Sequence, residues 1–320
     1  MPASAVETID PHQDRAFPKH DVVGVGVSEV DYEGIVAICR EWVAQRRARL
    51  VRAARYVCVT SVHGIVRARQ DADLRRALNR AEIATPDGMP VVWALRSFGV
   101  ARQKRVYGPT LMLRLCEDAR ANKHRIFLYG STPRCLDRLC LKLKNRFDGI
   151  EIAGAYSPPF RPLTPEEDEA EIRMIRESGA DIVFVGISTP KQEKWMYGRL
   201  EALPGVVMFG VGAAFDFHAG LVSQAPPWMQ RNGLEWFYRL CMEPKRLWKR
   251  YLIETPRFLP LWAMQRLRLG RPPRAPAFDW SRRPQTPEPP PAHLSSFLRS
   301  KLRPTGLRSN EACHPRRSGE

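Results

Sequence analysis

One carboxylate, Asp87, stands in the segment Thr85-Pro-Asp-Gly-Met-Pro90, where the sequence predicts a junction between strand and helix. The proline before it is not expected to extend a strand, and the glycine after it frees the backbone to turn. The apolar residues that follow predict a buried helix. Because open α/β enzymes place their chemistry at such junctions, Asp87 is a candidate general base. Capping of the helix is its alternative role.

Four turns of small residues follow predicted strands, and such turns let a backbone approach a phosphate or a sugar. None of them matches a Walker A loop or the glycine fingerprint of dinucleotide sites. Because the ends of parallel strands meet at one sheet edge, we expect the four turns together to bind a nucleotide diphosphate. Their candidate binding residues are Gly130, Ser131, Tyr156, Gly186, Gly210 and Gly212.

Polar side chains that follow two predicted strands, 181–185 and 56–60, are further candidates for substrate binding. Lys191 and Gln192 open a predicted helix, from which they could donate hydrogen bonds to a phosphate or sugar hydroxyl; an ordinary solvated helix start is the alternative. Thr60 and Ser61 end another predicted strand, and His63 follows them. Considered alone, His63 is better explained as a core or hydrogen-bonding residue than as a base.

Aromatic and basic residues alternate between residues 236 and 251. The spacing places Arg239, Arg246 and the Lys249/Arg250 pair near one helical face, provided that Pro244 begins a new turn. Such a face is typical of a membrane-surface helix or of a binding site for pyrophosphate. Both interpretations remain open on this pattern, beside that of a solvated basic face.

The sequence predicts neither a metal site nor a disulfide framework. Asp71-Ala-Asp73 has the Asp-x-Asp spacing of metal-dependent sugar-nucleotide enzymes, but it falls in a charged helical stretch with no strand before it. Seven cysteines are scattered without Cys-x-x-Cys spacing, which indicates a reducing cytosol. The start of the chain lacks an apolar signal region, and no run of about 18 apolar residues predicts a membrane span.

Short apolar runs alternate with longer helical patterns along most of the chain, which predicts an α/β fold with a mostly parallel, Rossmann-like sheet between layers of helices. The predicted strands are 22–27, 56–60, 125–129, 150–155, 181–185 and 206–211. The predicted helices are 32–46, 110–120, 133–146, 165–177 and 191–200.

Composition divides the chain into four predicted parts. Residues 1–20 form a disordered lead-in, 21–233 the catalytic domain, 234–269 a cationic and aromatic helical appendage, and 270–320 a disordered Pro/Arg-rich tail. The net charge of +17 requires an acidic partner, such as nucleic acid, an anionic membrane surface or a phosphorylated substrate.

Six ordered segments between about residues 22 and 258 resemble the WecG/TagA/CpsF family of bacterial glycosyltransferases, glycosyltransferase family 26. The segment around Asp87, together with His63, looks most like that of members from exopolysaccharide (xanthan-type) assembly. The six segments are 85–90, 105–108, 127–130, 185–193, 210–216 and 243–251.

The resemblance implies an inverting, metal-independent transfer of a sugar from a UDP-sugar to an undecaprenyl-diphosphate-linked saccharide, with no cofactor. The enzyme would be cytoplasmic and peripherally bound to the inner face of the plasma membrane. Two positions, Ser61 and Thr110, differ from the Asn and Asp of many members, so the donor sugar and the acceptor stay open. A homo-oligomer also stays open.

The resemblance further implies roles for individual residues. Asp87 would be the general base, and Gln192 would help to hold substrate. Arg239, Arg246 and the Lys249/Arg250 pair would belong to an appendage that binds membrane and completes the active site. Because no metal motif is credible, Arg239, Arg246 and Arg250 are the candidates for stabilising the departing diphosphate.

Two other classes of protein are alternatives to a glycosyltransferase. The high charge would suit a nucleic-acid-binding protein, but the basic residues concentrate toward the C-terminus and no nucleic-acid module is evident, so we expect no nucleic-acid partner. A nicotinamide-dependent oxidoreductase would use a Rossmann sheet, but its glycine fingerprint is missing.

Overall fold

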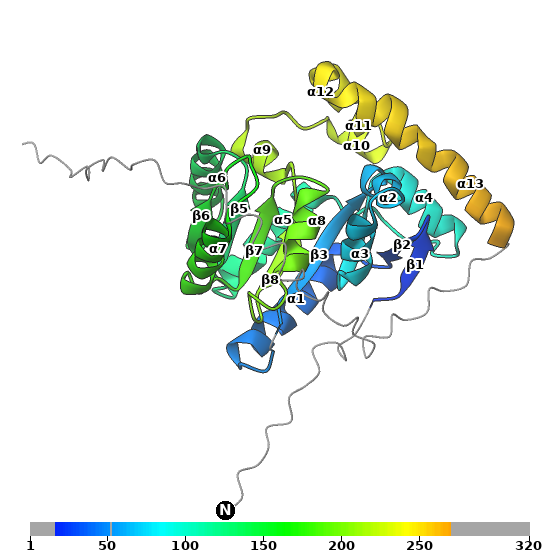
Figure 1. Cartoon of the computed structure of the whole chain (residues 1–320). Coiled ribbons are helices and arrows are strands. Elements are labelled where there is room, and N and C mark those ends of the chain that lie inside the picture. The colour runs from blue at the N-terminus through cyan, green and yellow to red at the C-terminus, as the bar shows by residue number, and fades with distance from the viewer. Residues whose placement is uncertain (1–16, 52, 270–320) are drawn as a thin grey trace, which may run out of the picture. The chain divides into compact units, whose positions relative to one another are not determined.

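A computed structural model describes residues 17–51 and 53–269 of the chain (Figure 1). The predicted lead-in lies mostly outside these residues, and the predicted tail, 270–320, lies wholly outside them. Within the described ranges, no helix is both long enough and apolar enough to cross a lipid bilayer.

Six parallel strands form the central sheet in the order β4-β3-β8-β7-β5-β6. This arrangement confirms the predicted Rossmann-like α/β class, since parallel neighbours require crossover connections such as the helices between them. The strands are β3 (Arg55–Ser61), β4 (Ile83–Asp87), β5 (Ile126–Gly130), β6 (Ile152–Tyr156), β7 (Ile182–Gly186) and β8 (Val207–Gly210).

Helices cover both faces of this sheet, so successive strand residues enter two separate cores. In β3, for example, Val57 packs into one hydrophobic cluster and Cys58 into the other. The first cluster includes residues of α1 (Tyr32–Arg47), α5 (Gly108–Ala121), α6 (Pro133–Arg146) and α9 (Ala214–Ala219). The second includes residues of α2 (Val62–Ala68), α3 (Ala72–Arg80), α4 (Met89–Ser97), α7 (Pro165–Glu177) and α8 (Lys191–Gly198).

The strand predicted at 22–27 is wrong, because the chain turns back in its middle. Val23 and Gly24 both adopt positive φ angles, 55° and 89°, and split the segment into β1 (Lys19–Val22) and β2 (Val25–Ser28). These two strands pair antiparallel in a small sheet of their own. Gly24 can adopt the positive φ angle that the turn needs. The apolar residues on both sides of it favoured one continuous strand.

The strand β4 ends at Asp87, as the predicted junction between strand and helix implies, but residues 83–87 are missing from the predicted strands. Pro86 lies inside it, although proline was not expected to extend a strand. The reason is position: β4 is an edge strand, so Pro86 needs no N–H for a second neighbour, while its carbonyl accepts a hydrogen bond from Val106 N at 3.0 Å.

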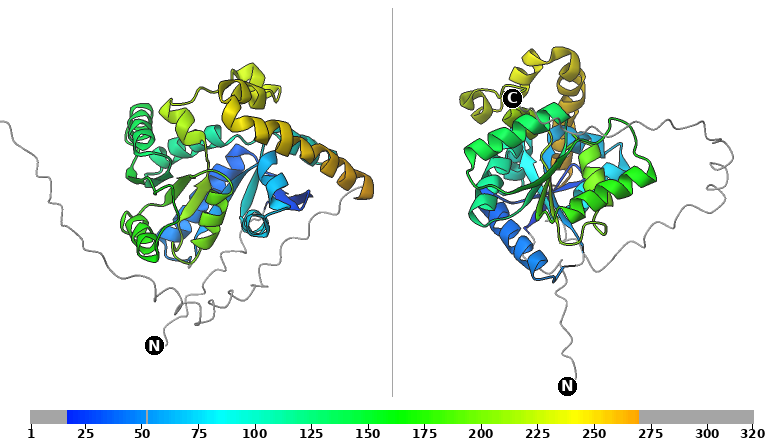
Figure 2. Two further views of the ribbon diagram at one scale, coloured as in Figure 1. Left: turned by 45° about the horizontal axis from the view of Figure 1, so that its top comes forward. Right: turned by 90° about the vertical axis from the view of Figure 1, so that its left-hand side faces the viewer.

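Beyond α10 (Pro227–Arg231), a chain of short helices forms the C-terminal appendage, residues 234–269. Figure 2 shows α13 running beside α2 and α4. Trp262 Nε1 donates to Ser97 Oγ at 3.2 Å, and the Gln265 side chain pairs with the backbone of the β1–β2 hairpin. The elements of the appendage are α11 (Glu235–Met242), α12 (Pro244–Trp248), the π-helical turn Lys249–Glu254, the short 3₁₀ turn Thr255–Arg257 and α13 (Phe258–Leu269).

Candidate active site

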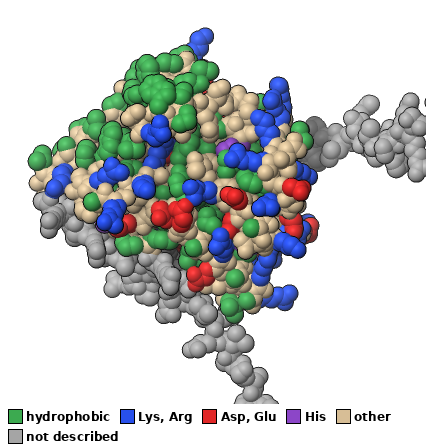
Figure 3. Space-filling view, turned by 180° about the vertical axis from the view of Figure 1, so that it is seen from behind, with side chains coloured by type: hydrophobic (Ala, Val, Ile, Leu, Met, Phe, Trp, Pro, Cys, Tyr) green, Lys and Arg blue, Asp and Glu red, His purple; other side chains and the backbone are tan. Residues whose placement is uncertain are grey.

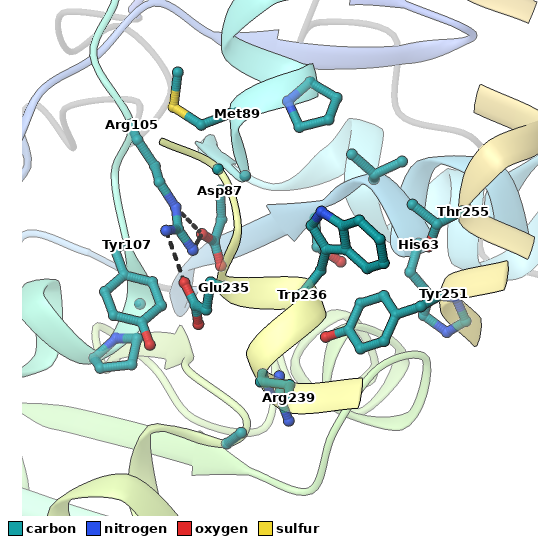
Figure 4. Close-up of a pocket in the computed structure, with 18 of the residues that line it drawn as sticks. His63, Asp87, Met89, Arg105, Tyr107, Glu235, Trp236, Arg239, Tyr251 and Thr255 are labelled. Carbon is teal, nitrogen blue, oxygen red and sulfur yellow. Dashed lines mark hydrogen bonds and ion pairs between the residues drawn. The ribbon is translucent and has the colours of Figure 1, made fainter. Parts of the chain in front are cut away.

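A pocket opens at the carboxyl edge of the sheet, between the ends of β3 and β4 and the first turns of the appendage (Figure 4). Ser61 and Asp87 end these two strands and are direct partners in the parallel register. Five of the residues predicted to bind or react line this pocket: Ser61, His63, Asp87, Arg239 and Arg250.

Asp87 is held by Arg105, which follows α4 in the chain. Arg105 Nε and Nη2 each lie 2.9 Å from the same oxygen, Asp87 Oδ1. Burial raises the pKa of the Asp87 carboxyl, Arg105 lowers it, and Glu235 raises it, with the net direction upward. Because Arg105 contacts Oδ1 alone, Oδ2 is left to accept a proton. The N-cap position of α4 is Gly88, and the Asp87 side chain pairs with Arg105.

Arg105 also contacts the appendage. Its Nη1 lies 2.8 Å from Glu235 Oε2, and its guanidinium carbon stands 4.2 Å from the centre of the Tyr107 ring. Burial lowers the pKa of Arg105, but the Asp87 and Glu235 carboxylates raise it by more than burial lowers it. The net direction is upward, so the guanidinium stays charged. Burial, and after it Glu235, raises the pKa of the Tyr107 hydroxyl.

Arg239 and Arg250 face the pocket from two different helical segments. In the described part of the chain neither forms an ion pair, and the Nε atom of each is buried without a hydrogen-bond partner. Arg239 lies over the Phe217 ring at 5.4 Å. Burial, and then the charge of Arg239, lowers the pKa of Arg250. Two half-buried cations without acidic partners make a site for an anionic group such as a diphosphate.

His63 lines the same pocket and is 8% exposed. Burial, and then the charges of Arg250 and Arg67, lowers its pKa to about 3, so the ring is neutral at neutral pH. Its Nδ1 lies 3.0 Å from an oxygen of Glu254, a contact between a neutral ring and a carboxylate rather than an ion pair. The neutral His63 ring can therefore donate or accept a hydrogen bond with a ligand, but it carries no positive charge to balance that of a phosphate.

A second group of predicted residues lies further along the sheet edge. The side chain of Gln192 is 3% exposed and packs against Gly210 and Gly212, where an added Cβ would approach it to 3.1 and 3.4 Å. Its Nε2 donates to Glu193 Oε1 at 3.1 Å, while its Oε1 is buried without a partner. Thr60, just below this edge, is buried and donates to the Cys58 carbonyl.

The glycines of two predicted phosphate turns have a packing role in this structure. Gly130 and Gly186 are register partners, and a Cβ on Gly130 would lie 2.6 Å from the Gly186 carbonyl carbon. Ser131 Oγ lies 3.2 Å from Asp216 Oδ1, so its hydroxyl already has a protein partner. Tyr156 lies at the end of β6, with its ring 6.1 Å from that of Tyr129. None of these residues lines the pocket around Asp87.

Two predicted cationic residues lie elsewhere on the surface. Arg246 is exposed and pairs with Glu243 through Nε and Nη2, so the structure does not bring it to the pocket with Arg239 and Arg250. Lys191 is exposed at the start of α8. Pro244 begins the new helix α12, as the helical-face interpretation required.

The Asp-x-Asp motif is used structurally. Asp71 caps α3 by accepting from Leu74 N at 3.0 Å, and it pairs with Lys194 at 2.8 Å. Asp73 is exposed and lies 3.4 Å from Arg76. Among the residues that the structure describes, no three His, Cys, Asp or Glu side chains gather as metal ligands would.

The comparisons with known proteins identify the family of the chain. Residues 20–272 match the family described as "Glycosyl transferase WecG/TagA/CpsF family". The chain belongs to this family of glycosyltransferases. It is similar to the N-acetylglucosaminyldiphosphoundecaprenol N-acetyl-beta-D-mannosaminyltransferase of Bacillus subtilis (strain 168), with 35% identity over 183 residues, 57% of this chain and 69% of the relative.

The enzyme of the same name from Bacillus spizizenii (strain ATCC 23059 / NRRL B-14472 / W23) is 33% identical over 193 residues, 60% of this chain and 72% of the relative. Membership in the family confirms the resemblance seen in the sequence. It favours a glycosyltransferase over the two other classes weighed above, the nucleic-acid-binding protein and the nicotinamide-dependent enzyme.

Sequence reasoning missed the two residues that connect Asp87 to the appendage. Arg105 stands in one of the segments that carry the family resemblance, but its partner was not evident because 17 residues separate it from Asp87. Glu235 is 8% exposed in the structure, but in the sequence it is one of several acids in the basic and aromatic segment, and nothing there marks it as buried.

Proposed function

We propose that this protein transfers a sugar from a UDP-sugar to a polyprenyl-diphosphate-linked saccharide, with inversion at the anomeric carbon and without a metal ion. One observation carries the proposal: a half-buried acid, Asp87, and two arginines without acidic partners, Arg239 and Arg250, line one pocket at the carboxyl edge of the sheet. An acid and a cationic pair are the two parts that such a transfer requires.

In the proposed step, Asp87 Oδ2 takes the proton of the acceptor hydroxyl while that oxygen bonds to the anomeric carbon. The bond from this carbon to the donor diphosphate breaks on the opposite face, and its electron pair leaves with UDP. The transition state resembles an oxocarbenium ion, by analogy with glycoside hydrolysis. Arg239 and Arg250 stabilise the negative charge that grows on the diphosphate.

The relatives suggest the first substrates to test. Both are named for N-acetylmannosaminyl transfer to N-acetylglucosaminyldiphosphoundecaprenol, so we propose an N-acetylhexosamine donor and an acceptor of this type. Glucose and uronic acid donors belong in the same screen, because the resemblance to exopolysaccharide members points to them as well. Release of UDP in the presence of vesicles and a synthetic acceptor is the readout.

We also propose that the appendage docks on the anionic inner face of the plasma membrane. Figure 3 shows hydrophobic side chains gathered at the top of the view, the end at which α12 lies in Figure 1, with basic side chains close by. Exposed apolar residues beside Arg and Lys are typical of membrane-surface helices. The large exposed hydrophobic residues of the appendage include Trp236, Phe237, Met242, Trp248, Leu252, Ile253, Leu259, Met264 and Leu267.

Replacement of Asp87 by Asn tests the mechanism. The variant should lose ~10²–10⁴-fold in kcat, the usual contribution of a general base, and should still bind UDP and melt as a folded protein. Asp73→Asn is the matched control, since that carboxylate is exposed on α3 and should leave the rate unchanged. Activity of Asp87→Asn within a few-fold of the wild type would remove Asp87 from the mechanism.

A further inference from the structure

Three charged residues from distant parts of the sequence meet at the base of the pocket. Asp87 ends β4, Arg105 lies between α4 and α5, and Glu235 is the first residue of α11. Figure 4 shows the Arg105 guanidinium between the two carboxylates, joined to both. We propose that Glu235 is a positioning residue which, through Arg105, fixes the Asp87 carboxylate and makes catalysis depend on the packing of the appendage.

The inference rests on the proposed role of Asp87 as general base and adds a residue outside the catalytic domain to it. The side chains of Asp87, Arg105 and Glu235 are 18%, 17% and 11% exposed, so water screens their interactions only in part. Buried ion pairs of this kind lose much more when one partner is removed than exposed pairs do.

The guanidinium of Arg105 has neighbours on two edges and on one face. One edge, Nε with Nη2, holds Asp87 Oδ1, the remaining nitrogen Nη1 holds Glu235 Oε2, and the face lies on the Tyr107 ring. A planar group held on two edges and one face has little freedom to rotate. The position of Asp87 Oδ1, and therefore the direction of Oδ2, depends on all three contacts.

Glu235 can act in this way only when the appendage is packed on the core. It is placed by the start of α11, and in the described residues this helix belongs to the same appendage that Trp262 and Gln265 attach to α4 and to the β1–β2 hairpin. An appendage held away from the core would leave Arg105 with one carboxylate instead of two. Asp87 would then be a weaker base and less well oriented.

The charge surrounding Asp87 gives the inference a distinctive signature. Arg105, Arg239 and Arg250 face it with positive charge, Glu235 faces it with negative charge, and the ionisable side chains Tyr32, Tyr107 and the neutral His63 complete its surroundings. Loss of the Glu235 charge favours ionisation of Asp87, whereas loss of the Arg105 charge opposes it. The acid limb of the pH–rate profile must therefore move in opposite directions in the two variants.

The experiment compares full-length wild type, Glu235→Gln and Arg105→Gln, with a UDP-sugar, a synthetic polyprenyl-diphosphate acceptor and anionic vesicles. Glu235→Gln should lower kcat about tenfold and move the acid limb to lower pH by about one pH unit, and Arg105→Gln should move it to higher pH. The KM for the UDP-sugar should change little in Glu235→Gln. Hydrogen exchange at the α11 amides should become faster in this variant.

Glu33→Gln is the matched control, because Glu33 also pairs with an arginine, Arg114, but on the exposed surface of α1. It should leave the profile unchanged. Should Arg105→Gln not fold, Glu235→Asp serves in its place, and partial recovery of kcat relative to Glu235→Gln would support the inference. An acid limb that stays in place in Glu235→Gln would overturn the inference while an inactive Asp87→Asn keeps the proposed function. An active Asp87→Asn would overturn the proposed function itself.

Discussion

At the scale of single residues, the pocket separates its positive charges by task. Arg105 is committed to two carboxylates, whereas Arg239 and Arg250 have buried nitrogens with no protein partner among the described residues. Since a buried guanidinium nitrogen without a hydrogen-bond partner is costly, these two half-buried arginines are suited to bind an anionic substrate. In the proposed mechanism, Arg105 would hold the base and the other two would bind the leaving group.

Replacement of Arg250 by Gln should therefore raise the KM for the UDP-sugar and lower kcat. The value of kcat/KM should fall at least about tenfold, because a charge-assisted contact to phosphate is worth ~1.5–3 kcal/mol. Lys249→Gln is the matched control, as its neighbour Lys249 is exposed and outside the pocket. Steady-state kinetics with a water-soluble acceptor separates the two. Equal losses in both variants would mean that general charge, and not the pocket, binds the donor.

The wild-type enzyme should lose activity in acid at a pH above the ordinary range of aspartate. Burial raises the pKa of Asp87, and the base must be deprotonated, so the rate should rise with pH through this raised value and then level. His63 is neutral throughout the range and should add no second acid limb. A pH series of kcat in the wild type and in His63→Gln tests both statements, and an acid limb that disappears in His63→Gln would contradict them.

At the scale of elements, the appendage has both a packed side and an exposed side. Leu247 and Phe258 are buried, at 2% and 1% exposure, whereas Trp248 and Leu252 are 50% and 56% exposed. Such two-sided helices pack on the core by one side and can meet a lipid surface with the other. The same segment also places Glu235, Arg239 and Arg250 at the pocket.

A chain that ends at Gly233 should lose both vesicle binding and catalysis and should stay soluble. A chain that ends at Leu269 keeps the whole appendage and should retain both properties. The double variant Trp248→Ser/Leu252→Ser should reduce sedimentation with anionic vesicles and leave kcat on a soluble acceptor within about twofold, since neither side chain is buried. Full activity of the chain ending at Gly233 would show that the appendage is dispensable.

At the scale of the whole molecule, the charge of +17 should govern the encounter with the membrane. Binding to anionic vesicles should weaken as salt is added, because charges are screened over ~8 Å at physiological ionic strength. Binding of UDP in the partly buried pocket should be less sensitive. Sedimentation and UDP-binding titrations at rising salt provide the comparison, and equal sensitivity would argue against two separate electrostatic sites.

Activity should also survive a chelator. Asp71 is engaged by Leu74 N and Lys194, and Asp73 lies on the helix surface with Arg76, so neither side chain is placed to hold a metal beside a diphosphate. Addition of EDTA should leave the rate of UDP release essentially unchanged, because no metal is expected to take part in the transfer. Strong inhibition that manganese or magnesium reverses would contradict this expectation.

The sequence by itself determined the α/β class, five of the six strands of the central sheet, five of the helices around it, and the family. Periodicity and capping signals act over a few residues, so α6 and α7 were predicted with the bounds that the structure has. Asp87 and the small residues at the strand ends were also evident, since a parallel sheet places all its strand ends at one edge. The sequence did not show that β4 is an edge strand, which can contain a proline, so residues 83–87 were missing from the predicted strands. It also did not show the turn at Val23 and Gly24 that divides residues 22–27 into two strands.

Only the tertiary structure decided which charges meet. Arg239 and Arg250 reach the pocket although Arg246, close to both in sequence, pairs with Glu243 on the outside. Arg105 joins Asp87 to Glu235, a residue 148 positions further along the chain than Asp87. Such contacts depend on how α11 packs against the edge of the sheet. Local pattern contains no information on that packing, because the free energy of an ion pair depends on distance and burial and not on separation in sequence.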